Sequence, residues 1–301
     1  MKLTDEKEKY LKVCKEIKGL SNLTLKAYQI DLAQFCVFMD IKDWLRKESL
    51  LSYITFLHKT YKPKSAKRKI ACVKAFYRYM EIENIIEYNP FHKIILKYKE
   101  PVTLPKTIPL EIVYKLLSHA HQKYRQAVTI SEKEITLRDA LIIELLFSTG
   151  MRISELTHLK ISDLNLTNNT IRIFGKGAKE RIMCITNTEI KKMINKYLGI
   201  RNSCSDYIFL NRLGNRLSEQ SVRNMLSRYA REAGISMHIT PHMFRHTFAT
   251  ELHNADVDIH YIQQLLGHSS ISTTQIYTHI STSKMGEILR EKHPRNHHNF
   301  N

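Results

Sequence analysis

The chain reads TGMRISEL over residues 149–156, and this stretch predicts the end of one helix and the start of the next. A helical segment at 138–148 precedes it, and Gly150 is the residue type that most often follows the last turn of a helix. Arg152 and Glu155 then lie three positions apart on one helical face, where the carboxylate can steady the guanidinium. The junction therefore presents a supported cation at the start of a helix.

Helical patterns dominate the chain before this junction. Helices are expected over 24–39, with Thr24 as N-cap, and over about 65–80, because apolar residues recur there at steps of three and four. The apolar face of the second of these comprises Ile70, Val73, Phe76, Tyr77 and Met80. Residues 110–119 predict another helix, and 122–136 look like a long connection to the helix before the junction.

A row of basic residues follows another face of the 65–80 helix. Its members, here called the basic stripe, are Lys64, Lys67, Lys74 and Arg78, with Ala71 in the gap. Such a row on a packed helix can follow a phosphate backbone. An ordinary solvated helix face is the alternative, and the spacing fits both equally well.

Strand-like alternation appears after the junction. Ile171 and Ile173 precede the turn GKGAKER at 175–181, and Ile182 and Ile185 follow it, which predicts a β-hairpin with a basic tip. The turn lacks the spacing and the strand–loop–helix context of a nucleotide-binding loop. Helices are expected over most of the remaining chain.

The segment TPHMFRH, which begins at Thr240, predicts a helix start with that threonine as N-cap. His242 and Arg245 then share one face, and an imidazole with a cation near a helix N-terminus suits a phosphate oxyanion. His242 and His246 also have the i,i+4 spacing of metal ligands. The segment lacks the glutamate of an HExxH motif, however, and Arg245 would repel a cation, so no metal is expected here.

A further apolar helix is expected to end at Gly267, with His268 directly after it. Ser272 or Thr273 can then cap a short helix that carries Tyr277. Each of these pieces is weak alone, because a single histidine or exposed tyrosine is most often structural. Only the ordered set is specific.

The composition limits the class of protein. The chain has 301 residues, 43% hydrophobic and 25% charged, which excludes a disordered or fibrous chain. Nine glycines and seven prolines favour helices over a turn-rich β-protein. Lys and Arg number 47 against 29 Asp and Glu, a net charge of +18, which points to a polyanionic partner, foremost nucleic acid. A solvated basic surface is the alternative.

Cysteine usage and the chain start indicate a compartment. Five scattered cysteines without a CxxC pair favour reduced core thiols over a disulfide framework or a zinc site. The charged first residues and the lack of a long apolar run predict neither a signal peptide nor a membrane span. We therefore expect a cytoplasmic, nucleoid-associated protein.

The prolines predict a domain boundary. Four of the seven fall between residues 90 and 109, and proline disfavours helix in the residue before it, so this region reads as extended. We expect an α-helical N-terminal domain over 1–100, a linker at 101–109 and a C-terminal domain over 110–301. Residues 1–105 carry half of the net charge, so both domains should contact the polyanion, as a clamp would.

Taken in order, the motifs resemble those of the tyrosine recombinases (the phage integrase family), most closely the bacterial Xer subgroup. The stretches that carry the resemblance are 149–156, 175–181, 241–246, 266–269 and 272–279. The N-terminal helices and the linker also look like that family's core-binding domain, so the resemblance spans nearly the whole chain. It implies a mainly α-helical fold, with a SAM-like core-binding domain followed by an α+β catalytic domain that contains a small β-hairpin.

The resemblance implies a reaction carried by side chains. Tyr277 would attack the scissile phosphodiester and leave a 3′-phosphotyrosyl link with a free 5′-hydroxyl. Lys176, at the hairpin tip, would protonate the departing 5′ oxygen. No cofactor and no metal are implied, and the covalent link would conserve the energy of the phosphoester.

The remaining site residues would bind the phosphate. By the resemblance, Arg152 and Arg245 would hold the non-bridging oxygens, and His268 would add a hydrogen bond. His242 would act as a general base or a phosphate ligand, and Glu155 would be a support residue. No catalytic position is substituted.

Partners follow from the same resemblance. Double-stranded DNA would be bound by a homotetramer or heterotetramer at the recombination synapse, with an activating partner protein and no membrane. The family pattern implies that an apolar stripe of Met285, Ile288 and Leu289 docks on a neighbouring protomer. Packing on its own domain is the alternative.

Several roles fit these features. An Xer-like role in chromosome or plasmid dimer resolution, and so in chromosome partition and cell division, is favoured because the N-terminal region leaves no space for an additional arm-site domain. Integration or excision of a mobile element is the alternative within the family. Outside it, a type IB topoisomerase would relax plasmids, a non-catalytic DNA-binding regulator would lack a catalytic residue, and a metal-dependent nuclease would be inhibited by EDTA.

Overall fold

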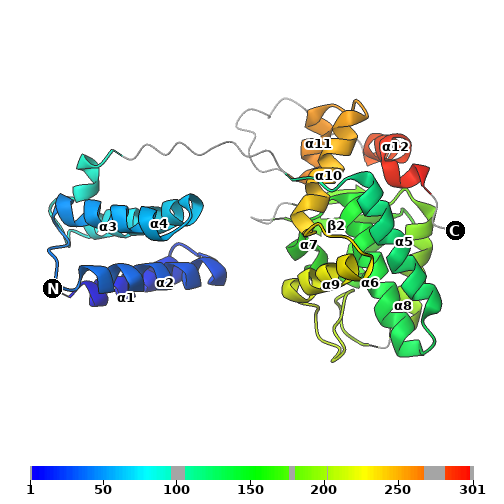
Figure 1. Cartoon of the computed structure of the whole chain (residues 1–301), viewed down its shortest axis with the longest axis horizontal. Helices are drawn as coiled ribbons and strands as arrows, with labels where there is room; N and C mark the ends of the chain where they lie inside the picture. The colour runs from blue at the N-terminus through cyan, green and yellow to red at the C-terminus, as the bar shows by residue number, and fades with distance from the viewer. Residues whose placement is uncertain (1, 96–105, 176–179, 202, 268–281, 299–301) are drawn as a thin grey trace. The chain divides into compact units, whose positions relative to one another are not determined.

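The computed structural model describes residues 2–95, 106–175, 180–201, 203–267 and 282–298, with the backbone alone for 282–284. The chain divides into two compact units, Met1–Thr103 and Leu104–Asn301. Each unit has its own hydrophobic core, and Figure 1 shows the helices of both.

The described part of the first unit contains α1 (Leu3–Glu16), α2 (Asn22–Met39), α3 (Lys47–Thr60), α4 (Pro63–Ile82) and the 3₁₀ helix η1 (Pro90–Lys93). In Figure 1, α1 and α2 form a lower layer and α3 and α4 an upper one. The core between them is rich in aromatic rings, for example Phe35 and Tyr53, whose centroids lie 5.0 Å apart. The apolar face expected for the 65–80 helix is buried on α4, so the opposite face of that helix is left to solvent.

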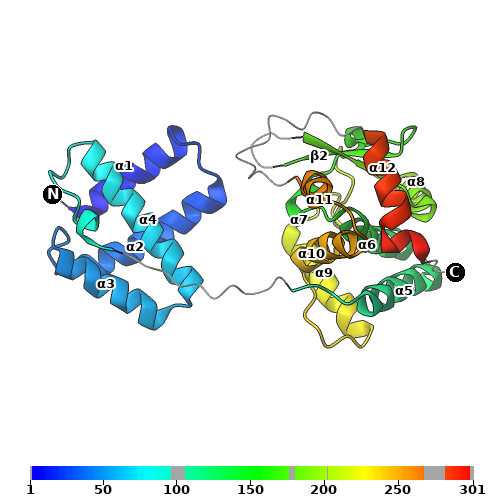
Figure 2. The same ribbon diagram turned by 90° about the horizontal axis from the view of Figure 1, so that it is seen from above.

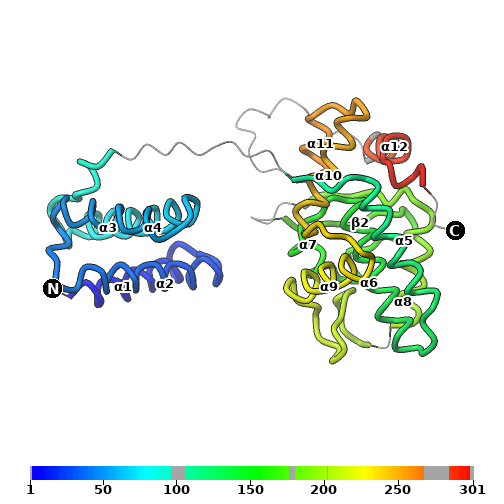
Figure 3. Tube along the Cα trace, in the orientation of Figure 1, coloured from blue at the N-terminus to red at the C-terminus, as the bar shows by residue number. Residues whose placement is uncertain are grey.

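The described part of the second unit contains the helices α5 (Leu110–Gln126), α6 (Ile130–Thr149), α7 (Ile153–His158), α8 (Thr188–Ile200), α9 (Glu219–Glu232), α10 (Pro241–Asn254), α11 (Ile259–Leu266) and α12 (Thr282–Lys292). Residues 139–147 of α6 are all buried, because α5, α8 and α10 pack around this helix (Figures 2 and 3). A helix that is buried on all sides is typical of the centre of a domain. The helix before the junction is therefore the axis of the unit.

A small antiparallel sheet completes the second unit, with strand order β1 (Leu164–Asn165), β2 (Thr170–Phe174) and β3 (Glu180–Cys184). It confirms the expected hairpin and the mainly α-helical fold. Ile171 and Ile173 are buried, whereas Ile182 is exposed. The register pairs Ile173 with Arg181, so an arginine occupies a position on β3 where a simple alternation would put an apolar residue.

Two expectations about helix boundaries are wrong. Helix α2 begins before Thr24, because the Ser21 hydroxyl accepts a hydrogen bond from the Thr24 N–H and caps it. The region 122–136 is mostly helical rather than a long connection, because Thr129 and Glu132 form a capping box that starts α6 at Ile130. This first turn of α6 is solvent-exposed and polar, so it has no apolar period.

The cysteines and helix lengths bear on the remaining expectations. Cys14, Cys36 and Cys72 are buried free thiols, whereas Cys204 is exposed, so the prediction of a core position is wrong for Cys204. No helix in the described ranges is long and apolar enough to cross a membrane.

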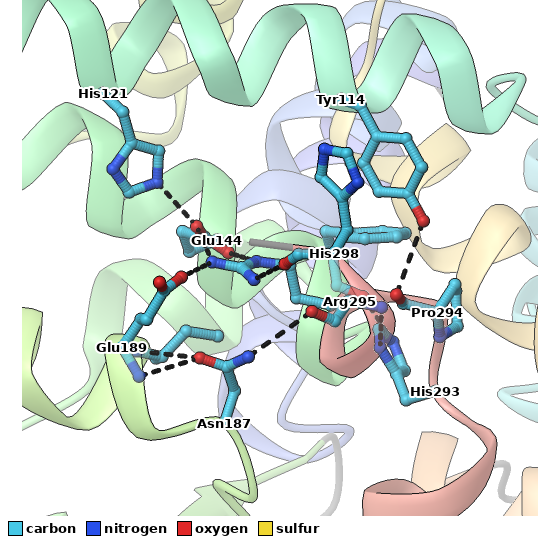
Figure 4. Close-up of polar contacts among 11 residues, drawn as sticks. Tyr114, His121, Glu144, Asn187, Glu189, His293, Pro294, Arg295 and His298 are labelled. Atoms are coloured by element: carbon cyan, nitrogen blue, oxygen red, sulfur yellow. Dashed lines mark hydrogen bonds and ion pairs between the residues drawn. The ribbon is translucent and has the colours of Figure 1, made fainter. Parts of the chain in front are cut away.

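The C-terminal segment packs on its own unit. Leu289 of α12 lies in the core of the second unit, with Met285 and Ile288 packed against it, which is the alternative to docking on a neighbour. Beyond α12, the fully buried Arg295 donates from Nε and Nη2 to the carboxylate of Glu144 on α6, at 2.6 and 2.8 Å (Figure 4). A buried ion pair with two parallel hydrogen bonds thus anchors the segment to the central helix.

A buried histidine beside this ion pair also contacts α6. The Nε2–H of His293 donates to the Phe147 carbonyl at 3.3 Å, and its Nδ1 accepts from the Arg295 N–H at 3.1 Å. This pairing requires the neutral ring. Burial lowers the pKa of His293 from 6.5 to about 4, and the nearby Arg295 charge acts in the same direction.

His293 should make the stability of the second unit sensitive to mild acid. Between pH 6.5 and pH 4 the unfolded chain binds a proton at this ring and the folded chain does not, so stability falls as the pH drops through that window. From pH 7.5 to pH 5.0 the protein should lose about 2 kcal/mol more unfolding free energy than the His293→Gln variant. Urea unfolding at the two pH values measures this difference.

The exposed His253 at the end of α10 provides a control. His253→Gln should show the same pH dependence as the unchanged protein. An equal pH dependence in His293→Gln would mean that His293 does not couple protonation to folding.

Candidate active site

The site is built on the junction between α6 and α7. Gly150 ends α6 in the left-handed conformation, with φ of 58°. A Cβ at this position would lie 2.7 Å from Cδ1 of Phe248 on α10, so neither the conformation nor the space admits a side chain. The close approach lets the Gly150 carbonyl accept a hydrogen bond from Nη1 of Arg245 at 3.0 Å.

Arg152 and Glu155 form the pair that the sequence predicts. The Arg152 N–H donates to Oε2 of Glu155 and Nη1 of Arg152 donates to Oε1, both at 2.8 Å. Nη2 of Arg152 lies 3.5 Å from the Gly267 carbonyl at the end of α11. The Glu155 side chain is buried, whereas that of Arg152 is 35% exposed, so the supported guanidinium can be reached by a ligand.

Arg245 is a buried cation held by carbonyl oxygens. This arginine lies on α10. Its Nη1 donates to the Gly150 carbonyl, and its Nη2 donates to the Leu266 carbonyl at 2.7 Å. Among the described residues, no carboxylate lies within ion-pair distance of it. Burial, followed by the nearby charge of Arg152, lowers the pKa of Arg245 to about 10. A buried positive charge without a carboxylate partner is costly to maintain, and such groups mark sites that receive an anion.

His242 lies one turn before Arg245, at the exposed start of α10. The predicted helix start at Pro241 is confirmed, although the Thr240 side chain makes no capping hydrogen bond. His242 is thus displayed to solvent from the helix that carries the buried arginine.

Arg181 is a member of this cluster whose role the sequence did not predict. Its Nη1 and Nη2 donate to Oε1 and Oε2 of Glu155 at 3.0 and 2.7 Å, and its side chain is only 10% exposed. Burial alone would raise the pKa of Glu155, but hydrogen bonds and charge from Arg181, with those from Arg152, hold it below its ordinary value. The alternation of side chains along a strand could have indicated this position, because Arg181 lies two residues before the buried Met183 and therefore on the same face of β3.

Three expected site residues, Lys176, His268 and Tyr277, lie outside the described residues. Their neighbours in the chain are described. In the chain Lys176 falls between β2 and β3, and His268 follows Gly267, which ends α11 in the left-handed conformation. The junction, the hairpin and the end of α11 thus meet at the arginines.

The basic stripe lies on α4 of the first unit. Lys64, Lys67, Lys74 and Arg78 are all exposed. Two other cations of this helix, Arg68 and Lys69, instead pair with the buried Asp31 of α2. Lys74 and Arg78 line an open groove of about 720 Å³, together with Ala71, Ala75 and Phe91. The small alanines leave room for a ligand to approach the helix between the cations.

Among the described residues, no group of three or more His, Cys, Asp or Glu side chains is placed to hold a metal ion. Burial lowers the pKa of His246, and the neighbouring His242 and Arg245 lower it further.

Two family-level matches cover most of the chain. Residues 8–84 match the phage integrase N-terminal SAM-like domain, and residues 108–284 match the phage integrase family. A tyrosine recombinase of Agathobacter rectalis is 51% identical, with 97% of each chain covered. Tyrosine recombinase XerD of Listeria innocua is 36% identical, over 92% of this chain and 95% of the relative.

A solved structure shares the fold. The XerH site-specific recombinase bound to palindromic difH substrate, a post-cleavage complex, is 25% identical with a TM-score of 0.71. The match covers 93% of this chain and 83% of the other.

Proposed function

Since the chain belongs to the phage integrase family and is a tyrosine recombinase, we propose that it cuts and rejoins duplex DNA at a specific site through a phosphotyrosyl intermediate on Tyr277. The observation that carries this proposal is the arginine pair. Arg245 is buried without a carboxylate partner in the described ranges, and Arg152 beside it is partly open to solvent. Such a pair suits one phosphate of the DNA backbone.

Both parts of the chain take part in DNA binding. The core-binding domain over 1–100 contacts the duplex through the basic stripe on α4, and the catalytic domain over 110–301 contacts the scissile phosphate. The linker at 101–109 joins the two domains, so both can contact the same duplex. The net charge of +18 supports this arrangement.

The phosphate is held by four side chains. Arg152 and Arg245 donate to its non-bridging oxygens, where negative charge increases in the transition state. His268 adds a hydrogen bond, and His242 acts as a general base or a further phosphate ligand. Carbonyl and carboxylate partners fix both guanidinium planes before the DNA arrives, which reduces the reorganisation that the reaction needs.

The chemistry exchanges one phosphoester for another. The Tyr277 oxygen attacks phosphorus, the bond to the 5′ oxygen breaks, and Lys176 gives that oxygen a proton. The tyrosyl proton passes to His242 or to solvent. The 5′-hydroxyl of another strand then attacks the phosphotyrosine and releases Tyr277. The number of phosphoester bonds is unchanged, so no nucleoside triphosphate is required.

The biological role that fits best is Xer-like dimer resolution of a chromosome or plasmid, with a place in chromosome partition and cell division. The near full-length match to a XerD protein supports this role. Strand exchange between two duplexes involves four cleavage events, which four protomers of one or two kinds would supply. An activating partner and a location at the nucleoid in the cytoplasm complete the proposal.

The nucleophile provides the first test. Tyr277→Phe removes only a hydroxyl, so DNA affinity should persist while covalent protein–DNA adducts disappear. A denaturing gel with a nicked suicide substrate measures the adduct, and its yield should be unaffected by EDTA. Adducts of normal yield from Tyr277→Phe would contradict the mechanism.

The general acid provides the second test. An alkoxide is a poor leaving group, so Lys176→Ala should slow cleavage by about 10²- to 10⁴-fold with little effect on affinity. A 5′-bridging sulfur leaves without protonation, so cleavage of that substrate should return to nearly the rate of the unchanged protein.

Arg152→Ala is the matched control, because its contact is with non-bridging oxygens and sulfur should give it no rescue. If Lys176→Ala stays equally slow on the sulfur substrate, Lys176 is not the acid and Lys179 becomes the candidate.

The basic stripe provides the third test. Replacement of Lys67, Lys74 and Arg78 by Gln should flatten the dependence of log K on log salt by about 0.9 for each phosphate that the variant no longer neutralises. Lys12, Lys15 and Lys59 are exposed on other helices of the same unit, and their replacement by Gln provides a control of equal charge. Fluorescence anisotropy measures the slope of log K against log salt. Equal slopes in the two triple variants would mean that the basic stripe is an ordinary solvated helix face.

A further inference from the structure

One carboxylate in the second unit is shared by two arginines. Each oxygen of Glu155 accepts one hydrogen bond from Arg152 and one from Arg181, four in all, at 2.7 to 3.0 Å. Two of them come from the Arg181 fork and two from the backbone and side chain of Arg152. Both lone-pair directions of each oxygen are thus used, which fixes the plane of the carboxylate.

The sharing matters for charge. A single carboxylate paired with Arg152 alone would neutralise that guanidinium and pull it away from a ligand. With Arg181 present, the three groups carry a net charge of +1, and Arg245 raises the total at the site to +2. The second arginine therefore leaves Arg152 with attraction for a phosphate.

Arg181 also connects elements that are distant in sequence. It lies on β3, directly after the hairpin turn, and contacts Glu155 of α7. A Cβ on Gly267 would lie 3.1 Å from Nη1 and 3.2 Å from Cδ of Arg181, so the end of α11 packs closely against this side chain. The carbonyl of the same Gly267 lies 3.5 Å from Nη2 of Arg152.

The placement of Arg181 is not the one that stability alone would favour. Its Nε is buried and has no hydrogen-bond partner within the described ranges, and an unsatisfied buried donor is destabilising. Buried ion pairs are often no more stable than apolar residues of similar volume. A role in holding a functional geometry accounts for a buried arginine on the inner face of a strand.

We propose that Arg181 is a positioning residue for DNA cleavage: by sharing Glu155 it orients Arg152 and keeps its positive charge available to the scissile phosphate. This inference rests on the function proposed above. Arg181 contacts no reacting atom and acts through Glu155.

The test compares single-turnover cleavage of two suicide substrates at saturating DNA. One has an ordinary scissile phosphodiester. The other has a methylphosphonate, in which a methyl group replaces one non-bridging oxygen and removes the charge that Arg152 would stabilise. The stereoisomers are tested separately. The variants are Arg181→Gln and the milder Arg181→Lys, which keeps the charge but cannot make the two parallel hydrogen bonds.

Arg181→Gln should slow cleavage of the phosphodiester by about 10- to 100-fold, because a small displacement of a catalytic group has an effect of this size. Arg181→Lys should fall between Arg181→Gln and the unchanged protein. DNA affinity should change less than about twofold in both. On one methylphosphonate stereoisomer the defect of Arg181→Gln should shrink to less than about threefold. A general loss of folding would slow both linkages equally, so an equal defect on the two substrates would overturn the proposal.

Arg172→Gln is the matched control. Arg172 lies on the adjacent strand β2, is 48% exposed and lies 3.7 Å from Asp163, so its replacement removes the same charge from the same sheet. The Arg172→Gln variant should cleave each substrate at the rate of the unchanged protein on that substrate.

A second measurement uses Glu155→Gln as background. If Arg181 acts through Glu155, adding Arg181→Gln to Glu155→Gln should slow cleavage by less than about threefold further. Full multiplication of the two defects would overturn the proposal.

Failure of the proposed function is distinguishable, because adducts would then form without Tyr277. If Arg181→Gln forms Tyr277-dependent adducts at the rate of the unchanged protein, only the proposed role of Arg181 is rejected, and the proposed function stands.

Discussion

The shared carboxylate of Glu155 is the interaction on which the arginine cluster of the second unit depends. It joins the start of α7, the second strand of the hairpin (β3) and, through the arginines, the end of α11. A buried carboxylate with one cation would form a neutral pair. With two cations it leaves a net positive charge while remaining fully hydrogen-bonded, so the site stays attractive to an anion without an unpaired buried acceptor.

Two glycines make this arrangement possible. Gly150 and Gly267 both adopt left-handed conformations at helix ends, and each faces a side chain so closely that a Cβ would clash or press on it. Their backbone carbonyls, with that of Leu266, are the acceptors for Arg152 and Arg245. For Arg245 the backbone carbonyls thus take the place of a carboxylate, so its charge is not cancelled. For Arg152 the Gly267 carbonyl adds to the hold of the shared Glu155 carboxylate.

The sequence predicted the elements whose signals are local. The Arg152–Glu155 pair follows from helical spacing, the hairpin follows from alternation around a glycine-rich turn, and Gly267 marks a helix end. It did not predict the role of Arg181, because the partner of Arg181 lies 26 residues away in another element. The exposure of Ile182 also did not follow from the sequence, because the paired Arg181 occupies the inner face of β3. The N-cap of α2 is Ser21, and not Thr24 as was expected. The first turn of α6 was not predicted, because it is exposed and has no apolar periodicity.

The central helix α6 links this cluster to the C-terminal segment. Its last turn leads into Gly150, the Phe147 carbonyl accepts a hydrogen bond from His293, and Glu144 one turn earlier pairs with Arg295. The chain is therefore fixed on both sides of residues 268–281: at Gly267 by contact with Arg181, and beyond α12 by the buried ion pair. Because α6 is buried along most of its length, it cannot shift without disturbing the core. A rigid central helix thus supports both the arginine cluster at its C-terminal end and the segment that follows residue 281.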